Sequence, residues 1–482
     1  MERKSLVFAA MALMLLAGCK KTAPTTDPTL KDILFENGTT LGNGDAEFEI
    51  KGTYTLPKGT YSMKGWIYIC NGAKLTILPG TVIKGDKETK AALIAERGGQ
   101  LIAQGTADDP IVFTSAQPAG KRRPGDWGGI ILCGKARNNQ TEMMIEGGPR
   151  SMHGGTDDAD NSGILSYVRV EFAGYPFATD QEINGVTFGS VGSGTKVDHV
   201  QVSYSNDDSF EWFGGAVNCK YLIAYKGWDD EYDTDNGFSG KIQFCLGVRD
   251  PMIADQSASN GFESDNNATG SDAKPVTSCI FSNMTFIGPK FQNPAFANTS
   301  DYINGGSLNP QNGSRLGQFQ AAIQIRRNSN LSCFNSVMAG YPVGIIIEND
   351  KGSATQQAAT AGTFKIGSVT LANMTILGSD KNKSFVDGYT DNASNPDPNK
   401  ESFSSTYFKS MKGNQYLADD ASLKLNSSYM PLDGSPLLGS ADFSDTMLST
   451  GFVKVGYRGA FSSATDNWTA KWTNFDPQNT AY

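Results

Sequence analysis

The sequence predicts an all-β solenoid, in which short strand-and-turn units repeat along one axis. Three segments resemble one another: SYVRVEFAG at 166–174, DHVQVSYSN at 198–206 and KYLIAYKGW at 220–228. Each alternates polar and apolar residues, as a half-buried strand does, and each ends in a polar turn. Their first residues lie 32 and 22 positions apart. A period of about 20 to 30 residues with one strand-turn unit per repeat is typical of solenoids.

The composition agrees with a turn-rich β protein. The 482-residue chain contains 54 Gly and 20 Pro, and hydrophobic residues make up 39% of it. High Gly content with short alternating runs favours strands and turns over helices. The formal net charge of −9 argues against nucleic acid as a partner, because phosphate binding requires a basic face. Clustered carboxylates on an acidic surface are instead suited to divalent cations.

The N-terminal residues predict export and lipid anchoring. A basic pair at 3–4 precedes an apolar run at 6–16, which is too short to span a bilayer but fits a signal peptide core. The LAGC sequence resembles a bacterial lipobox, so we expect residues 1–18 to be removed and Cys19 to carry the lipid. Lysines follow Cys19 instead of the Asp that retains lipoproteins in the inner membrane. We therefore expect an outer-membrane protein exposed at the cell surface, with a periplasm-facing orientation left open.

The next parts of the chain predict a tether and a body. Residues 19–50 are polar, with Pro, Thr, Asp and Gly, and predict a lipid-anchored flexible tether. Alternating strands recur across 51–415 and predict the solenoid itself. Long polar stretches at 290–318 and 379–415 predict loops that leave the rod. Such loops are where a solenoid places its binding surface.

The C-terminal part, residues 416–482, breaks the repeat. It contains SSYMPLDGSPLLGSADF and two tryptophans, Trp468 and Trp472. A terminal repeat needs covering because an open sheet edge invites pairing with other chains. We therefore expect this part to form C-terminal coils and a cap over the last coil.

The cysteines that follow Cys19 predict neither a zinc site nor a defined disulfide pairing. An exported chain permits disulfides, but spacing alone fixes no pairing, and the chain has no CxxC and only two histidines, His153 and His199. We expect these thiols to fill inward positions, where Cys behaves as a small hydrophobe. They are Cys70, Cys133, Cys219, Cys245, Cys279 and Cys333.

Several motifs resemble those of a known superfamily. LTILPGTVIKG at 75–85, GGQLIAQGT at 98–106 and DPIVFTS at 109–115 resemble the opening coils of right-handed parallel β-helix proteins. That superfamily includes polysaccharide lyases, pectin hydrolases and adhesins. The resemblance implies a right-handed parallel β-helix with long inserted loops and a C-terminal cap.

A narrower resemblance covers most of the chain. The segments 160–174 and 182–215, with YRGAF at 457–461 and WTAKWTNFDP at 468–477, resemble outer-membrane β-helix lipoproteins and secreted surface proteins. Such proteins recur in bacteria that scavenge glycans and other polymers, and most have no established activity. The resemblance therefore implies the fold, and export to the cell surface, more than it implies a reaction.

Acidic turns follow the repeated strands and predict a cation site. NDDSFEWFGG at 206–215 and WDDEYDTDNG at 228–237 are similar, and SNGFESDNN at 259–267 is a third such turn. Because they recur at coil spacing, we expect their carboxylates to stack along one edge, where repulsion calls for a proton or a cation. Calcium fits, because it takes six to eight oxygens in flexible geometry. A solvated acidic edge whose side chains cap turns is the alternative. The candidate ligands are Asp207, Asp208, Glu211, Asp229, Asp230, Asp233, Asp235, Glu263 and Asp265.

Aromatic residues flank the same turns. Trp212, Phe213, Trp228 and Tyr232 are candidates for ligand contact, because sugar rings present apolar faces to aromatics and hydroxyls to carboxylates. Packing against the next coil is the alternative reading of these side chains.

These observations favour binding over catalysis. We expect the protein to bind an extracellular glycan, polymer or partner protein for adhesion or nutrient capture, with an outer-membrane transporter as a candidate neighbour. The alternative is a polysaccharide lyase or glycoside hydrolase that acts through the carboxylates. Arg326 or Arg327 could then serve as a lyase base, whereas His199 lies within a strand and is expected to be packed.

Overall fold

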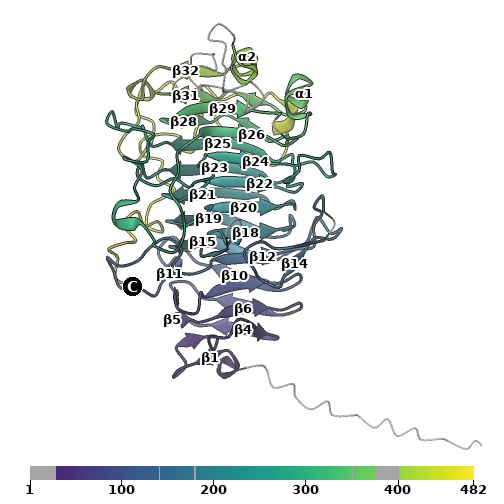
Figure 1. Cartoon of the computed structure of the whole chain (residues 1–482), viewed down its shortest axis with the longest axis vertical. Helices are drawn as coiled ribbons and strands as arrows, with labels where there is room; N and C mark the ends of the chain where they lie inside the picture. The colour runs from purple at the N-terminus through teal and green to yellow at the C-terminus, as the bar shows by residue number, and fades with distance from the viewer. Residues whose placement is uncertain (1–28, 141, 179–180, 350, 375–400) are drawn as a thin grey trace, which may run out of the picture.

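The strands wind into a rod whose coils are stacked along one axis (Figure 1). The computed structural model describes residues 29–140, 142–178, 181–349, 351–374 and 401–482. Two sheets run along the rod, a ten-stranded sheet B and an 18-stranded sheet A in the described part of the chain. Neighbouring strands of sheet B are parallel throughout. The fold is a right-handed parallel β-helix, as the sequence predicted.

Sheet B receives one strand from each coil. Its strands in chain order are β3 (Phe48–Ile50), β6 (Trp66–Ile69), β9 (Ala92–Ala95), β12 (Ile130–Cys133), β18 (Val186–Gly189), β20 (Phe210–Phe213), β22 (Tyr232–Asp235), β24 (Phe262–Ser264), β26 (Ala321–Ile325) and β29 (Val343–Ile347).

The other strands of the coils belong to sheet A. Its strands are β1 (Leu34–Phe35), β2 (Thr40–Leu41), β4 (Thr53–Leu56), β5 (Thr60–Met63), β7 (Lys74–Ile77), β8 (Val82–Gly85), β10 (Gln100–Gln104), β11 (Ile111–Ser115), β15 (Gly163–Glu171), β19 (Lys196–Ser203), β21 (Cys219–Tyr225), β23 (Lys241–Val248), β25 (Ile280–Ile287), β27 (Ser332–Phe334), β28 (Val337–Ala339), β30 (Ile366–Gly367), β31 (Thr370–Ala372) and β32 (Gln415–Leu417).

Two hairpins and a few short helices interrupt the coils. The hairpins are β13 (Met143–Met144) with β14 (Met152–His153), and β16 (Pro176–Ala178) with β17 (Gln181–Glu182). Among the described residues, the α-helices are α1 (Thr355–Thr360) and α2 (Phe403–Ser410), and the 3-10 helices are η1 (Leu30–Asp32), η2 (Gly306–Leu308), η5 (Ala421–Leu423) and η6 (Thr446–Leu448).

A corner in sheet A is built from residues with left-handed backbone. Tyr167, His199, Tyr221 and Phe244 occupy equivalent corners of successive coils, with φ between 51° and 61°. Their rings stack with centroid separations of 4.3, 4.6 and 5.3 Å. Because parallel strands in register repeat about every 4.8 Å, one side chain per coil forms a continuous ladder. The prediction that His199 is packed is therefore confirmed.

The rod begins earlier than the sequence predicted. β1, β2 and β3 all lie before residue 51, and β3 pairs in parallel with β6. Ile33, Leu41 and Ile50 are buried in the same core as the later coils. The tether predicted for 19–50 is therefore wrong for residues 33–50. Cys19 and the predicted signal peptide lie outside the described residues.

The predicted position of the cap is also wrong. The last coil of sheet B is covered by α2, where the backbone N–H of Ile347 donates to Ser404 Oγ at 2.9 Å. Tyr407 and Phe408 of α2 join the main core. Residues 418–482 instead return along the outside of sheet A, and the C-terminus lies beside β11 (Figure 1). We call this segment the C-terminal strap.

The strap is held by contacts with strands far away in the sequence. Trp472 is fully buried, and its ring packs edge-on against Tyr167 and His199 in the middle of the rod. Arg122 donates to the backbone oxygens of Pro477 and Thr480. The two tryptophans that were predicted to cap the last coil therefore cover the aromatic corner of sheet A.

The six cysteines among the described residues are free thiols, and five of them are buried. Four lie in the main core, whereas Cys133 lies on the outer face of sheet B beneath the hairpins. In the part of the chain that the structure describes, no helix is both long and apolar enough to span a bilayer.

Candidate functional site

Carboxylates gather on the outer face of sheet B, where alternation along the strands points them away from the core. In β20, Phe210 and Trp212 face inward and Glu211 faces outward. The strand register aligns Glu211 with Asp233 of β22, and Asp233 with Glu263 of β24. Three residues that are distant in sequence thus form one row of carboxylates, which we call the outer row.

A second row precedes the strands, in the turns that enter sheet B. Asp208 Oδ1 accepts the backbone N–H of Asp230 at 2.8 Å, and Asp230 Oδ1 accepts the backbone N–H of Asn260. Asn260 Oδ1 continues the series by accepting the N–H of Ala321 at 3.0 Å. Each side chain therefore caps a backbone donor of the following coil. We call Asp208, Asp230 and Asn260 the turn row.

The two rows meet and create an excess of negative charge. In the part of the chain that the structure describes, carboxylate oxygens lie within 4.8 Å of one another in three groups, namely Asp207 with Asp208 and Asp229, Asp208 with Glu211 and Asp233, and Asp230 with Asp233 and Glu263. Asp208, Glu211 and Asp230 are only 7%, 8% and 4% exposed. Burial first, and neighbouring carboxylates second, raise the pKa of these three side chains well above its usual value.

Arginines neutralise one end of this array. Arg326 Nε lies 2.9 Å from Asp265 Oδ1, and Arg327 lies 2.6 Å from the other oxygen of Asp265. Arg326 also pairs with Glu263. Two arginines held in ion pairs are poor proton acceptors, so the role of a lyase base is not favoured for them. Asp265 is already neutralised by these two partners.

Glu231 is separated from the other acidic residues. It forms a fully buried ion pair with Arg249 at 3.0 Å. Burial raises the pKa of Glu231 to about 7. Its charge is therefore matched within the fold, in contrast to Asp208, Glu211 and Asp230, for which no ion pair occurs among the described residues.

A cavity of about 550 Å³ adjoins the carboxylates. Asp207, Asp229 and Asp255 line it, and Ser257 donates to Asp229 Oδ2 at 2.5 Å. Burial first, and Asp255 second, raise the pKa of Asp229 to about 8. The long loop predicted at 290–318 forms one wall, where Ser314 accepts a hydrogen bond from Asn206 Nδ2 at 2.7 Å.

Two buried amide oxygens beside the carboxylates have no hydrogen-bond partner among the described residues. Asn206 Oδ1 lies at the cavity, and Asn184 Oδ1 belongs to a side chain that also donates to Glu211. Both asparagines are almost fully buried. An unpaired buried acceptor is costly, so these oxygens are available to accept a hydrogen bond from water or to bind a cation. Sequence reasoning missed both residues, because a lone Asn carries no spacing signal.

The predicted ligand-contacting aromatics do not face this cavity. Trp212 and Tyr232 point into the core, where their rings stack with those of neighbouring coils. Trp228 is fully buried beneath its turn, and Phe213 packs on the outer face of sheet B with Ile145 and Ile183. The prediction of ligand contact is therefore wrong for these four residues. Phe177 is an aromatic residue that lines the cavity.

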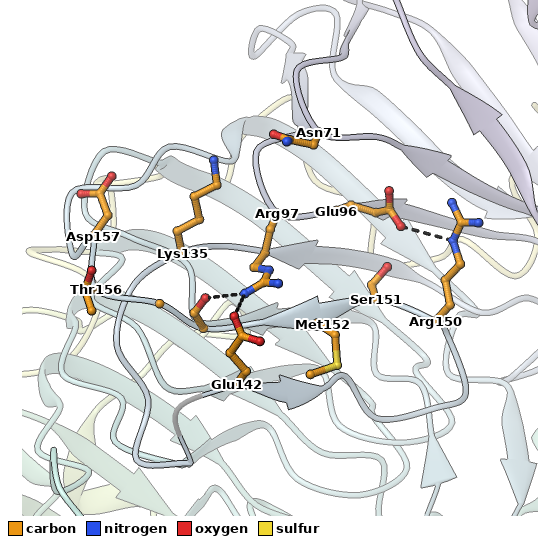
Figure 2. A pocket seen from close by; sticks show the side chains of 12 residues that line it. Asn71, Glu96, Arg97, Lys135, Glu142, Arg150, Ser151, Met152, Thr156 and Asp157 are labelled. Carbon is orange, nitrogen blue, oxygen red and sulfur yellow. Dashed lines mark hydrogen bonds and ion pairs between the residues drawn. The ribbon is translucent and has the colours of Figure 1, made fainter.

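A second hollow, of about 650 Å³, lies beside the ends of β6, β9 and β12 (Figure 2). Arg97 pairs with Glu142 at 2.6 Å, and Arg150 lies 3.3 Å from Glu96. Lys135 and Asp157 also line it. Charges of opposite sign balance one another here, in contrast to the one-sided charge of the carboxylate rows.

The stacked parallel coils define a class of protein, the parallel β-helix proteins. More particularly, a family model described as a pectate-lyase-like beta helix domain matches residues 48–415, and the chain belongs to this family. Searches of curated proteins and of solved structures give no match. The membership confirms the superfamily predicted from the sequence.

Proposed function

We propose that this protein binds an extracellular polymer with the help of calcium ions on the outer face of sheet B. The observation that carries the proposal is a set of buried carboxylates, Asp208, Glu211 and Asp230, without a cationic partner among the described residues. Such charges must be neutralised by protons or by a cation, because burying an unpaired charge is expensive. Calcium suits oxygen-rich sites of irregular geometry.

The proposed ligands come from the outer row, the turn row and the adjoining cavity. Asn184 and Asn206 supply two further buried oxygens that lack a donor. Asp235 is aligned with Phe213 at the end of β22 and, with Glu263, would act at the edge of the array. Asp265 is omitted because two arginines already hold it. The carboxylates proposed to hold calcium are Asp207, Asp208, Glu211, Asp229, Asp230 and Asp233.

The polymer would occupy the 550 Å³ cavity. An ion at its floor would retain free coordination positions, which hydroxyl or carboxylate oxygens of a glycan can fill. Phe177 offers an apolar surface for a sugar ring, and Arg315 offers a cation at the same wall. Chelation is therefore expected to weaken both ion binding and polymer binding.

A lipid anchor at Cys19 would place this site outside the cell. The lipobox-like sequence at 16–19 supports export, outer-membrane attachment and a role in adhesion or nutrient capture, next to a transporter or another surface partner. Metabolic labelling with a radioactive fatty acid tests this part of the proposal. Label is expected on the wild type and not on Cys19→Ser.

Glycoside hydrolysis is the second candidate function. Asp229, with its pKa raised to about 8, keeps a proton at neutral pH and shares the cavity with Asp255. Burial first, and Asp229 second, raise the pKa of Asp207 well above its usual value, so Asp255 is the candidate carboxylate of the pair. A protonated carboxyl beside a carboxylate is the pairing that glycosidases use. New reducing ends after incubation with a polysaccharide would favour this function, whereas recovery of intact polymer would favour binding alone.

Calorimetric titration with calcium, followed by a polysaccharide panel with and without chelator, tests the main proposal. Asp208→Asn keeps the oxygen that accepts the Asp230 N–H but removes one charge, so calcium affinity is expected to fall at least tenfold. Asp272→Asn, on an exposed side chain, is the matched control. Unchanged calcium affinity in Asp208→Asn, or polymer binding that ignores chelation, would contradict the proposal.

A further inference from the structure

We propose that a second, calcium-independent ligand site lies between sheet A and the C-terminal strap, and that it binds a sugar unit of a neutral glycan. A cavity of about 430 Å³ opens there. Its floor comes from Tyr225 and Leu246, and its walls come from three parts of the strap, at 427–429, at Phe461 and at 467–475. Its volume falls within the range of small-molecule sites.

The first wall is a tight turn that is fixed by Asn426. Asn426 Oδ1 accepts the backbone N–H groups of Ser428 and Met430 at 2.9 and 3.0 Å. The turn holds Tyr429 in the left-handed region, with φ of 63°. A bulky residue keeps such a conformation only when its surroundings impose it. The ring of Tyr429 is therefore presented by a rigid support.

The second wall is equally fixed. Trp472 Nε1 donates to the backbone oxygen of Trp468 at 2.8 Å, and Thr473 Oγ1 donates to that of Thr469 at 2.8 Å. Lys471, between them, also has a left-handed backbone, with φ of 76°. The cavity is thus formed before any ligand arrives, which lowers the entropy cost of binding.

Four aromatic rings contribute to the apolar part of the lining. Tyr225, Tyr429, Phe461 and Phe475 all face the cavity. Phe475 is 40% exposed, although its ring contacts that of Tyr225 at 5.1 Å. Sugar rings carry apolar C–H faces that pack against aromatic rings, and burying an exposed Phe in this way is favourable.

Apart from Lys471, the polar side chains of the lining are uncharged. Among the described residues, Lys471 is the only charged side chain of the lining, and its ammonium is already paired with Asp108 at 2.8 Å. Ser427 and Ser428 are exposed at the rim and present hydroxyl groups, which can both donate and accept. A neutral, hydroxyl-rich ligand matches this lining. An aromatic peptide side chain would fill the cavity but would make no hydrogen bonds to the rim hydroxyls, which would stay solvated by water.

Saturation-transfer NMR and calorimetry with neutral oligosaccharides test the proposal, using α- and β-linked gluco-, manno-, galacto- and xylo-oligosaccharides in the presence of chelator. At least one is expected to bind. Phe475→Ala is expected to weaken that binding at least tenfold. Val453→Ala is the control, because Val453 is a strap residue of similar exposure, 47%, outside the lining. Ser428→Trp, from an exposed position, should block the cavity and abolish binding.

Several outcomes would overturn the proposal. The first is that none of the oligosaccharides binds. The second is that Phe475→Ala and Ser428→Trp bind the oligosaccharide with unchanged affinity. The third is that N-acetyl-tyrosine amide binds and no sugar does. Sugar binding that chelator abolishes and Asp208→Asn weakens would assign the ligand to the carboxylate site instead. These experiments can therefore contradict the proposal for either site without contradicting the proposal for the other.

Discussion

The side-chain amide of Gln201 forms two hydrogen bonds with the backbone of Asn474, in the same way as the backbone of a paired β-strand does. Gln201 Nε2 donates to the carbonyl oxygen of Asn474 at 2.7 Å, and Gln201 Oε1 accepts its N–H at 2.8 Å. The same arrangement joins Gln243 to Val453 and Asn335 to Asp442. Three amide side chains on the surface of sheet A thus hold the C-terminal strap in register.

Loss of the Gln201 amide should loosen the strap. Gln201 is fully buried, so Gln201→Ala leaves two backbone groups of Asn474 without partners and is expected to cost about 1–3 kcal/mol in local stability. Hydrogen exchange of the Asn474 backbone amide measures this loss of local stability directly, and exchange should be faster in Gln201→Ala than in the wild type. The control Gln140→Ala changes an exposed side chain and should leave the exchange rate of the Asn474 amide unchanged. Equal exchange rates in all three proteins would contradict the role of the amide pair.

Truncation of Trp212 should damage the fold. Trp212 is fully buried and stacks on Phe188 at 5.3 Å, so Trp212→Ala is expected to lower the free energy of unfolding by about 3–5 kcal/mol. Thermal unfolding provides the measurement, and Leu432→Ala, at a side chain that is 42% exposed, should change it little. A stable Trp212→Ala protein with weakened polymer binding would restore the ligand role that packing argues against.

The metal-free protein should lose stability as the pH rises through the neutral range. Burial raises the pKa of Asp229 and Asp235 to about 8, whereas an unfolded Asp has a pKa of about 3.9. Between these values the folded state keeps protons that the unfolded state has released. The free energy of unfolding should therefore fall by about 1.4 kcal/mol per pH unit for each carboxyl that stays protonated.

Melting temperatures at pH 6.5 and 8.5 in chelator test this expectation. Burial lowers the pKa of folded His153 to about 4, below this window, whereas an unfolded His has a pKa of about 6.5, at its lower limit. The proton that unfolded His153 still releases above pH 6.5 raises the free energy of unfolding only slightly and does not mask the expected fall. Calcium competes with protons, so the rise in melting temperature on adding calcium should be larger at pH 8.5. A metal-free protein that is more stable at pH 8.5 would contradict the placement of these carboxylates.

The buried thiols should be unreactive while the protein is folded. Burial raises the pKa of Cys279 and Cys333 to about 12, and both side chains are fully buried. Because the thiolate is the reactive form, a thiol reagent should modify neither residue in the native protein and both after denaturation. Cys70, half-buried with a pKa of about 11, is the internal comparison. Rapid native labelling of Cys279 would show that the core opens.

The stacking of the coils could be predicted from the sequence because strand alternation and coil spacing are local properties. Those two periods place Glu211, Asp233 and Glu263 on one flank, and the register brings them into one row. The direction of the aromatic side chains could not be predicted in the same way. The strand FEWF at 210–213 places aromatic residues on both of its faces, so its own sequence does not tell which face is buried in the core. Packing against the neighbouring coils decides that Trp212 faces inward and Phe213 faces outward.

The sequence by itself thus determined the all-β solenoid and the stacked carboxylates, since both follow from repeats that neighbouring residues carry. Only the tertiary structure decided the early start of the rod, because β1 and β2 have two residues each and give no periodic signal. The tertiary structure also decided the path of the C-terminal strap, where Gln201 pairs with Asn474, 273 positions further along the chain. Contacts over such separations depend on which surfaces the finished rod exposes, and no local pattern encodes them.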